Sequence, residues 1–365
     1  MTAFIDSFAT QQLLPPWRAR GVRTWGFAIR LDRERVEAYL EKYFNGGYPD
    51  RAPYRYEPLP GPQFGLFTVA DVPEVASHNP GTLQRLGANP VGWDALSYLE
   101  LYLGIPVLRR TVTPDKLLVD PKLVWVQPFV FCNNPTAVFS SREIWGTDVN
   151  LATMTREAGP DPAHLHIDTA MVGIKAFSPR SITQLLACVH IQTGDVASAD
   201  LPTMLKANPD LERFVSILGG SGVFADHAPP AGVGESPFQQ GVELDNLKQF
   251  RDCFDMGAAI YRAIVASKSS HSEVDNIVFF DPAQVDIDFL WSDSIAEVLK
   301  TIFGAQKPGP VGPPAGHVRN SPPATVDEVD WDLDSIPIKA ELAFSFTSNV
   351  DFEVIGTLYT YGAPR

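Results

Sequence analysis

Large apolar side chains fall at every second position in several parts of the chain, which is the period of a β-strand. The clearest case is the segment Trp25 to Leu31, WGFAIRL. Similar runs follow, and they read FGLFTVA, YLELYLGIPVL, LVWVQPFVF, NLKQF, VDIDFLW, IKAELAFSFTS and FEVIGTLYTYG. The last two are expected to be separate strands around Asn349-Val350-Asp351.

A β-hairpin is expected from HLHIDTAMVGIKAF and SITQLLACVHIQTG, which flank a turn at Ser178-Pro179-Arg180. A turn centred near Pro179 places Asp168 opposite His190. Because strand side chains alternate, His164, His166 and Asp168 are expected on one face.

Helical spacing is confined to short segments. Asp32 is expected to cap a helix that ends at Asn45-Gly46-Gly47, and Asn134-Pro135 starts a second helix that ends at Gly146. Further helices are expected over 201–220 and about 293–304, and loops over 219–237 and 306–324, which are rich in Gly and Pro. Many strands, few helices and no βαβ alternation predict an α+β fold with a large antiparallel sheet.

Composition and charge narrow the classes of partner. The chain has 365 residues, of which 43 are acidic and 29 are Lys or Arg, giving a net charge of −14. An acidic chain without a block of basic residues is poorly suited to phosphate backbones or anionic lipid, so neither nucleic acid nor a membrane is an expected partner. The sequence contains no run of about eighteen apolar residues, so no membrane span is predicted.

The three cysteines, Cys132, Cys188 and Cys253, lie far apart and are odd in number. The first residues lack the basic and apolar pattern of a signal peptide. Together these features predict a reduced, cytoplasmic setting.

The most informative motifs lie between Tyr98 and Asn150, where YLELYLGIPV is followed by about twenty residues of strand and then by NNPTAVFSSREIWGTDVN. This stretch resembles the acetoacetate decarboxylase family, whose members carry a Tyr-x-Glu-x-x-x-x-Ile-Pro-Val-like strand and a Gly-Arg-Glu helix. Weaker similarity in IDTAMVGIKAF, NLKQFRD and VDIDFLW extends the resemblance from Trp25 to Tyr361, with insertions expected at 195–240 and 306–324. The resemblance implies a single domain over residues 1–365, folded as an antiparallel β-cone or barrel with helices outside and a pocket within.

Family members decarboxylate β-keto acids with a lysine that forms a Schiff base, while a second lysine lowers the pKa of the first. Aligning Arg142 and Glu143 with the family's Arg-Glu places Val149 and Asn150 at the two lysine positions. Neither side chain can form an imine, so orthodox decarboxylation is not expected.

Two other lysines, Lys175 and Lys248, would replace the missing pair only by reaching the pocket from another strand. The alternative for both is a surface position. Lys248 is retained as a substrate-binding candidate.

The resemblance also supplies candidate site residues. Arg142 is expected to bind a substrate carboxylate and Glu143 to orient it or exchange protons, although an Arg–Glu structural pair is the alternative. Glu100 matches the acidic residue of the family's strand, and Tyr98 and Tyr102 share its face. A carboxyl group in such a pocket is expected to have a raised pKa and to serve as general acid or base.

The histidines form a second constellation, independent of the resemblance. His164, His166, Asp168 and His190 match the ligand sets of zinc or non-haem iron. The alternative is a set of hydrogen-bonded histidines in a wet β interior. Trp145 is expected to be a core residue.

Three functions are compatible with the sequence. The first is an acetoacetate decarboxylase-like enzyme that acts on an oxo acid or enolisable carbonyl compound by acid–base chemistry of the lyase, hydratase or isomerase type, with no cofactor and no Schiff-base lysine. The second is a metal-dependent enzyme that uses the histidine constellation. The third is a non-catalytic protein that binds a hydrophobic ligand. The expected partners are a small carbonyl or carboxylate substrate and further copies of the chain.

Overall fold

The computed structural model describes residues 14–46, 52–78, 96–157, 164–179, 181–194, 199–220, 242–251, 259–306, 329–331 and 333–361. The strands are β1 (Trp17–Leu31), β2 (Tyr54–Pro58), β3 (Gln63–Ser77), β4 (Leu96–Val112), β5 (Leu118–Cys132), β6 (Val149–Leu151), β7 (Thr153–Glu157), β8 (His166–Gly173), β9 (Gln184–Thr193), β10 (Val242–Arg251), β11 (Ala259–Phe280), β12 (Val285–Leu290), β13 (Ser335–Ile338) and β14 (Ala340–Tyr361). The helices are α1 (Arg33–Leu40), α3 (Pro135–Ser140), α4 (Leu201–Ala207), α5 (Asp210–Gly220) and α6 (Ala296–Phe303), with the short turns η1 (Glu41–Asn45), η2 (Ser141–Trp145) and η4 (Pro282–Gln284).

The larger sheet closes on itself. Its strand order is β2-β4-β3-β1-β14-β11-β10-β5-β6, and β4 also pairs with β5. The strands β4, β3, β1, β14, β11, β10 and β5 therefore form a ring, to which β2 and β6 are attached. Every pairing within the ring is antiparallel except that of β5 with β10. The expected α+β fold with a large antiparallel sheet is confirmed.

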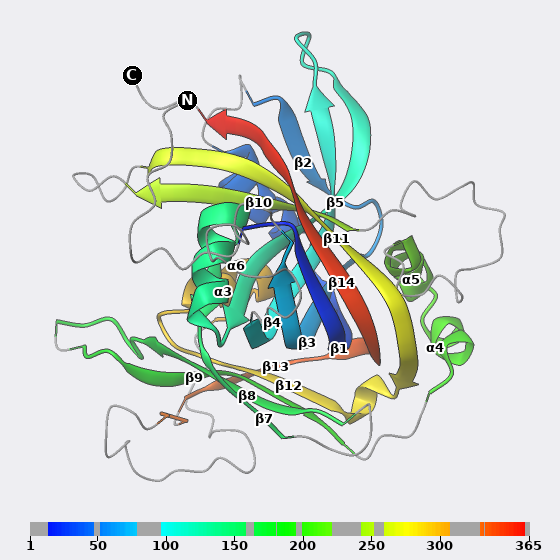
Figure 1. Cartoon of the computed structure of the whole chain (residues 1–365), viewed down its shortest axis with the longest axis vertical. Helices are drawn as coiled ribbons and strands as arrows, with labels where there is room; N and C mark the ends of the chain where they lie inside the picture. The colour runs from blue at the N-terminus through cyan, green and yellow to red at the C-terminus, as the bar shows by residue number, and fades with distance from the viewer. Residues whose placement is uncertain are drawn as a thin grey trace.

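The smaller sheet has the order β13-β12-β9-β8-β7 and lies across the lower ends of β1, β3, β4 and β14 (Figure 1). Its core face carries Phe289, whose ring centroid is 5.5 Å from that of Phe67 and 5.6 Å from that of Phe129 in the ring sheet. The largest hydrophobic cluster of the described residues thus lies between the two sheets.

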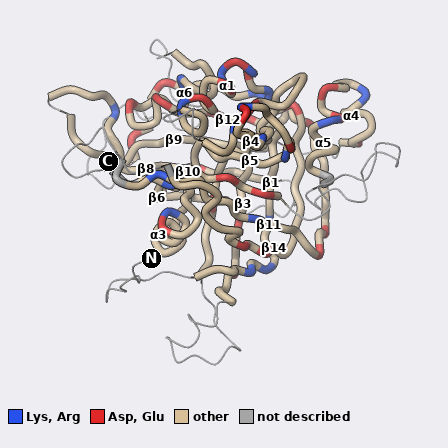
Figure 2. Tube along the Cα trace, turned by 90° about the horizontal axis from the view of Figure 1, so that it is seen from above, with Lys and Arg blue, Asp and Glu red and all other residues tan. Residues whose placement is uncertain are grey.

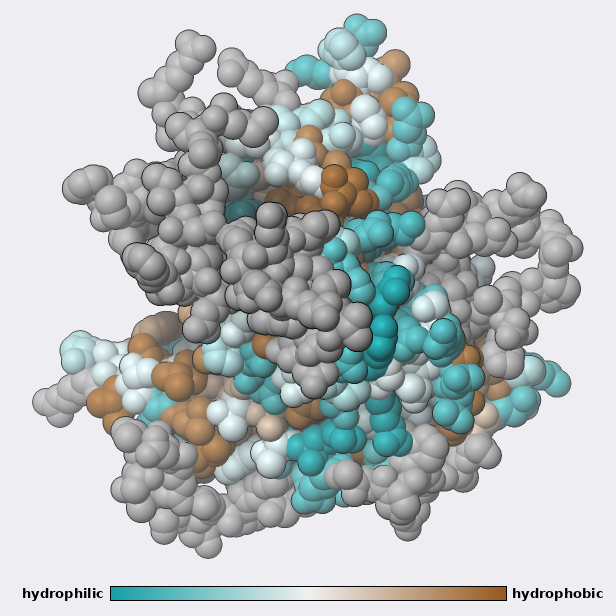
Figure 3. Space-filling view, in the orientation of Figure 1, coloured by the Kyte–Doolittle hydropathy of each residue, from teal (hydrophilic) through white to brown (hydrophobic). Residues whose placement is uncertain are grey.

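The hairpin of β8 and β9 has the expected register, because Asp168 pairs with His190. Near its turn, Val172, Phe177 and Ile182 are 64%, 69% and 67% exposed. Figure 3 shows hydrophobic side chains gathered at the lower left, over this hairpin. Exposed apolar patches are typical of interaction surfaces, and the homo-oligomer expected from the sequence stays a prediction.

Helix caps follow the expected chemistry. The Asp32 side chain accepts hydrogen bonds from the amides of Glu34 and Arg35, and Asn134 caps α3 in the same way. Gly146 adopts a left-handed conformation with φ of 71° and ends η2.

Three expectations about elements are wrong. Residues 201–220 form two helices because Asn208 and Pro209 interrupt the hydrogen-bond ladder. The last helix begins at Ala296, after a turn, rather than at Asp293.

The third error concerns the end of the chain, where β14 runs without a break through Asn349 and Asp351. These polar residues stay in the strand because both of its neighbours hold it. Asn349 pairs with Ser272 of β11, and Asp351 pairs with Arg18 of β1, whose Nε lies 2.6 Å from Asp351 Oδ1.

Several expectations fall outside the described residues, namely Cys253 and most of the segments 195–240 and 306–324. Cys132 and Cys188 are buried free thiols. Among the described helices, none is both long and apolar enough to cross a membrane. Figure 2 shows Lys and Arg spread over several elements and interspersed with Asp and Glu.

Candidate active site

A cavity of about 150 Å³ lies within the ring sheet. It is lined from all seven strands of the ring, from η2 and from the end of α5. Most of the lining is apolar, and its polar members include Thr24, Thr68, Tyr98, Glu100, Tyr102, Gln127, Asn246, Ser267, Ser269 and His271. A cavity of this size admits a small organic molecule.

Strand alternation on β4 places the sequence-predicted carboxylate in this cavity. Tyr98, Glu100 and Tyr102 line it, whereas Leu101 and Leu103 point to the opposite face and are fully buried between the sheets. The structure therefore brings the three predicted β4 residues together on one wall.

Burial controls the protonation of this wall. Desolvation raises the pKa of Glu100 from 4.5 to about 7, and no other cause contributes. Desolvation, together with the negative charge of Glu100, raises the pKa of Tyr102 to about 12 and that of Tyr98 well above 10. Near neutral pH, Glu100 thus exchanges its proton readily while both phenols keep theirs.

A second wall comes from β11, which the strand pattern did not predict. His271 lines the cavity, and burial lowers its pKa to about 4, so the ring is neutral at pH 7. Its Nδ1 is 2.9 Å from Ser348 Oγ, and its ring packs edge-on against Phe346 with 5.5 Å between centroids. The sequence feature that could have predicted this wall is the recurrence of polar residues at every second position, at Ser267, Ser269 and His271.

Trp145 in η2 forms one end of the cavity. It is 6% exposed, as a core residue would be, and its ring lies 5.1 Å from that of Trp17. No acceptor in the described part of the chain lies within hydrogen-bond distance of its buried Nε1. Trp145 is thus a packing residue at the cavity wall, as expected from the sequence.

Arg142 and Glu143 do not reach the cavity, contrary to expectation. Ser141 and Trp145 line the cavity from η2, whereas Arg142 and Glu143 are exposed. Arg142 Nη2 is 3.6 Å from Asp148 Oδ1 at the surface. Arg142 thus has an acidic neighbour at the surface in Asp148 and does not line the cavity, where the substrate carboxylate was expected.

The residues at the expected lysine positions belong to β6. Val149 is buried beside Val130 of β5, in the apolar cluster that borders the cavity. Asn150 pairs with Phe131. The candidate lysines Lys175 and Lys248 occupy other places.

Lys175 binds Asp330 at 3.1 Å, away from the cavity. Lys248 lies on β10 and donates a hydrogen bond to the carbonyl oxygen of Glu143, and burial lowers its pKa. It is outside the described cavity lining, although Asn246, two residues earlier on the same strand face, lies within it.

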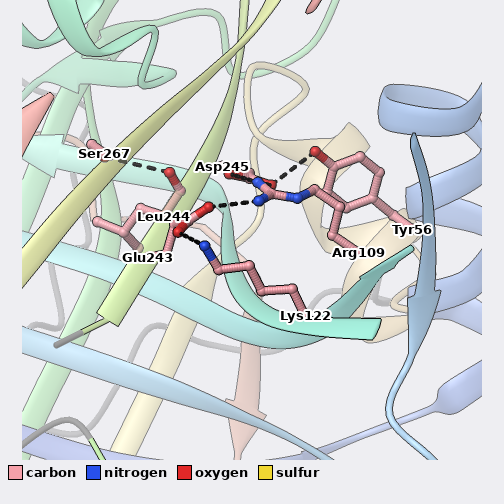
Figure 4. A network of polar contacts seen from close by, with 7 residues as sticks. All are labelled: Tyr56, Arg109, Lys122, Glu243, Leu244, Asp245 and Ser267. Atoms are coloured by element: carbon pink, nitrogen blue, oxygen red, sulfur yellow. Dashed lines mark hydrogen bonds and ion pairs between the residues drawn. The ribbon is translucent and has the colours of Figure 1, made fainter. Parts of the chain in front are cut away.

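A buried ionic network lies on the opposite face of β10 (Figure 4). Asp245 is fully buried and accepts hydrogen bonds of 2.8 and 2.7 Å from Arg109 and one of 2.8 Å from the Tyr56 hydroxyl. Glu243 contacts both Arg109, at 2.8 Å, and Lys122 of β5. This network ties β10 to β2, β4 and β5, and we assign it to the scaffold.

The histidine constellation forms in part. His166, Asp168 and His190 come together on the small sheet, with their ligand atoms within 4.8 Å of one another. His164 does not belong to the group, and none of these residues lines the cavity. The histidine group therefore lies apart from Glu100, so an ion bound to it would not contact a molecule in the cavity.

No family model and no curated protein matches the chain. Among solved structures, the acetoacetate decarboxylase of Legionella pneumophila matches with 10% identity and a TM-score of 0.49, over 97% of this chain and 92% of that one. The similarity spans nearly the whole chain. An acetoacetate decarboxylase-like enzyme from Sphingomonas wittichii RW1 matches with 11% identity and a TM-score of 0.45, over 98% and 100% of the two chains.

The enduracididine biosynthesis enzyme MppR, complexed with pyruvate, matches with 11% identity and a TM-score of 0.44, over 96% of this chain and 95% of that one. At TM-scores below 0.5, no residue role is transferred from these matches, and the site rests on the geometry of this chain.

Proposed function

We propose that this chain is an enzyme that moves a proton at the carbon next to the carbonyl of a small oxo acid, with Glu100 as the acid–base group. The carrying observation is a buried carboxyl group whose pKa is raised to about 7 on the wall of an apolar cavity. A general acid–base group is most effective when its pKa lies near the working pH.

Removing that proton places negative charge on the carbonyl oxygen, and the cavity offers donors for it. Tyr98 and Tyr102 keep their protons because burial raises their pKa values. Such donors stabilise a developing oxyanion most strongly where water is excluded. Lyase, hydratase and isomerase reactions that begin with proton removal at this carbon of an oxo acid pass through an enolate of this kind.

The proposed reaction proceeds without an imine. Val149 and Asn150 stand where the resemblance expects lysines, and Lys248 is engaged with Glu143. Lys268 borders the cavity, but strand alternation directs its side chain away from the face of Ser267 and Ser269.

The test is proton–deuterium exchange at the carbon next to the carbonyl, followed by proton NMR in D₂O with pyruvate, 2-oxobutyrate and acetoacetate as probes. The chain should accelerate exchange of at least one probe, with a rate that rises as Glu100 ionises through about pH 7. Glu100→Gln should lower the rate by about 10²- to 10⁴-fold. The matched control is Glu212→Gln, on the exposed side of α5, which should leave the rate unchanged.

Three outcomes would contradict the proposal. Near-normal exchange in Glu100→Gln would make Glu100 structural. Tight binding of an oxo acid without exchange by any probe would favour a non-catalytic binding protein. A borohydride-trapped adduct mapped to Lys248 or Lys268 would replace the proposed acid–base route with an imine.

A further inference from the structure

The outer face of the small sheet carries two cross-strand rows of polar residues. One row runs through Glu157, His166, Gln192 and Asp286, and the other through Thr155, Asp168, His190 and Asp288. The neighbouring residues Ile167 and Ile191 point to the opposite face and fill the core between the sheets. Strand register alone thus gathers two imidazoles and four carboxylates on one face.

Three of these side chains converge at the centre of the face. His190 Nδ1 lies 2.7 Å from Asp168 Oδ1, and His166 Nε2 lies 3.5 Å from Asp168 Oδ2. Ligand atoms around a tetrahedral zinc ion are separated by roughly 3.3–3.5 Å, given its metal–ligand bonds of about 2.0–2.2 Å. The two histidines approach different oxygens of Asp168, and the three ligand atoms all lie within 4.8 Å of one another, so side-chain rotations would be needed to bring them to one ion.

Neighbouring groups favour a cation. His190 is 3% exposed, which holds its ring in place, and Asp288 pairs with it from β12. On the other side, His166 Nδ1 lies 3.3 Å from Glu157 Oε2. A carboxylate on the second ring nitrogen is the usual way in which a metal-binding histidine is oriented. Neither row contains Lys or Arg.

The geometry points to a divalent transition-metal site on this face, with His166 Nε2, His190 Nδ1 and Asp168 as ligands and Glu157 as the positioning residue. Two histidines and one carboxylate leave coordination positions for water, as in open zinc or ferrous sites. A bound ion would join β8 to β9 and stabilise the small sheet. The site is separate from the Glu100 cavity and does not depend on the function proposed for it.

The test uses the full chain, stripped with a chelator and titrated with Zn²⁺ by calorimetry. One equivalent should bind, and the melting temperature should rise because the ion binds only the folded chain. Co²⁺ in place of Zn²⁺ should give visible absorption bands whose intensity reports the coordination number of the bound ion.

Four variants and one control separate a ligand site from general surface binding. His166→Gln, Asp168→Asn and His190→Gln should each lower the affinity at least about tenfold, and Glu157→Gln should lower it by about 10- to 100-fold. His164→Gln is the matched control, because His164 lies two residues from His166 but outside the group, and it should bind as the parent does.

His190 is buried, so His190→Gln is compared only when circular dichroism shows a native fold. If this variant does not fold, His166→Gln and Asp168→Asn decide the test, because they change less buried side chains. The proposal is overturned if no stoichiometric binding occurs. It is equally overturned if these two variants bind Zn²⁺ as the parent does, or if His164→Gln loses binding to the same extent.

Discussion

The protonation of Glu100 makes the stability of the folded chain depend on pH. The folded chain holds the proton up to about pH 7, whereas the unfolded chain releases it near the ordinary value of 4.5. Between these values the folded state binds more protons than the unfolded state. The free energy of unfolding contributed by this group therefore falls as the pH rises from about 4.5 to about 7.

Glu100→Gln should remove this loss, because an amide has no proton to release in this range. We expect the variant to match the parent near pH 4.5 and to be more stable by about 3 kcal/mol at pH 8. Urea unfolding at a series of pH values measures the difference. A constant difference across the series would show that Glu100 is not desolvated in the folded chain.

How far the site could be predicted also depends on individual residues. Glu100 was predictable because β4 alternates cleanly, so the leucines fixed which face is the core. Trp145 is a core residue as predicted, but the sequence does not show which of the buried aromatic residues also line the cavity. Arg142 and Glu143 matched a motif, but side-chain direction in η2 depends on how this turn docks, which the motif does not encode.

At the scale of elements, one pairing in the ring differs from the others, and we call this contact between β5 and β10 the seam. The parallel contact between β5 and β10 has a single registered pair, Leu244 with Trp125. The ionic network around Asp245 spans this seam, since Arg109 comes from β4 and Lys122 from β5. Ion pairs between side chains thus join β10 to its neighbours here, whereas backbone hydrogen bonds join the other neighbouring strands of the ring.

Arg109→Met should destabilise the chain by about 3–5 kcal/mol, because it leaves Asp245 buried without its cation and Glu243 with Lys122 alone. Combining it with Asp245→Leu should recover part of the loss. Arg110→Met is the control on the next residue of β4, where the pair with Glu57 is partly exposed, and should cost about 1 kcal/mol or less. Denaturant midpoints measure all three. Equal losses for the two arginine variants would contradict a special role for the seam.

Most strands and helix ends were predictable from local chemistry, because alternation and capping act over a few residues. The two longest strands, β11 and β14, were not predicted as continuous elements. Asn349 and Asp351 suggest a turn when considered alone, and only pairing with Ser272 and Arg18 keeps them extended. Such long-range pairing has no local signal.

At the scale of the whole molecule, the cavity and the histidine group occupy different sheets. Removing divalent cations with a chelator should therefore lower the melting temperature while leaving α-proton exchange unchanged within about twofold, if both proposals hold. The two readouts are measured on the same sample. Exchange that disappears on chelation and returns with Zn²⁺ would instead place the ion in the reaction.

The ring joins parts of the chain that are made at very different times. β1 pairs with β14 through residues roughly 310–335 positions apart, such as Trp17 with Phe352. At about 5–20 residues per second, a ribosome needs about 15–65 s to make the chain between them. During that interval the edge of β1 that will face β14 is unpaired, and the cavity lacks the side that β14 supplies. A nascent chain of this design therefore spends most of its synthesis exposed to aggregation, and its dependence on chaperones should end only when β14 emerges.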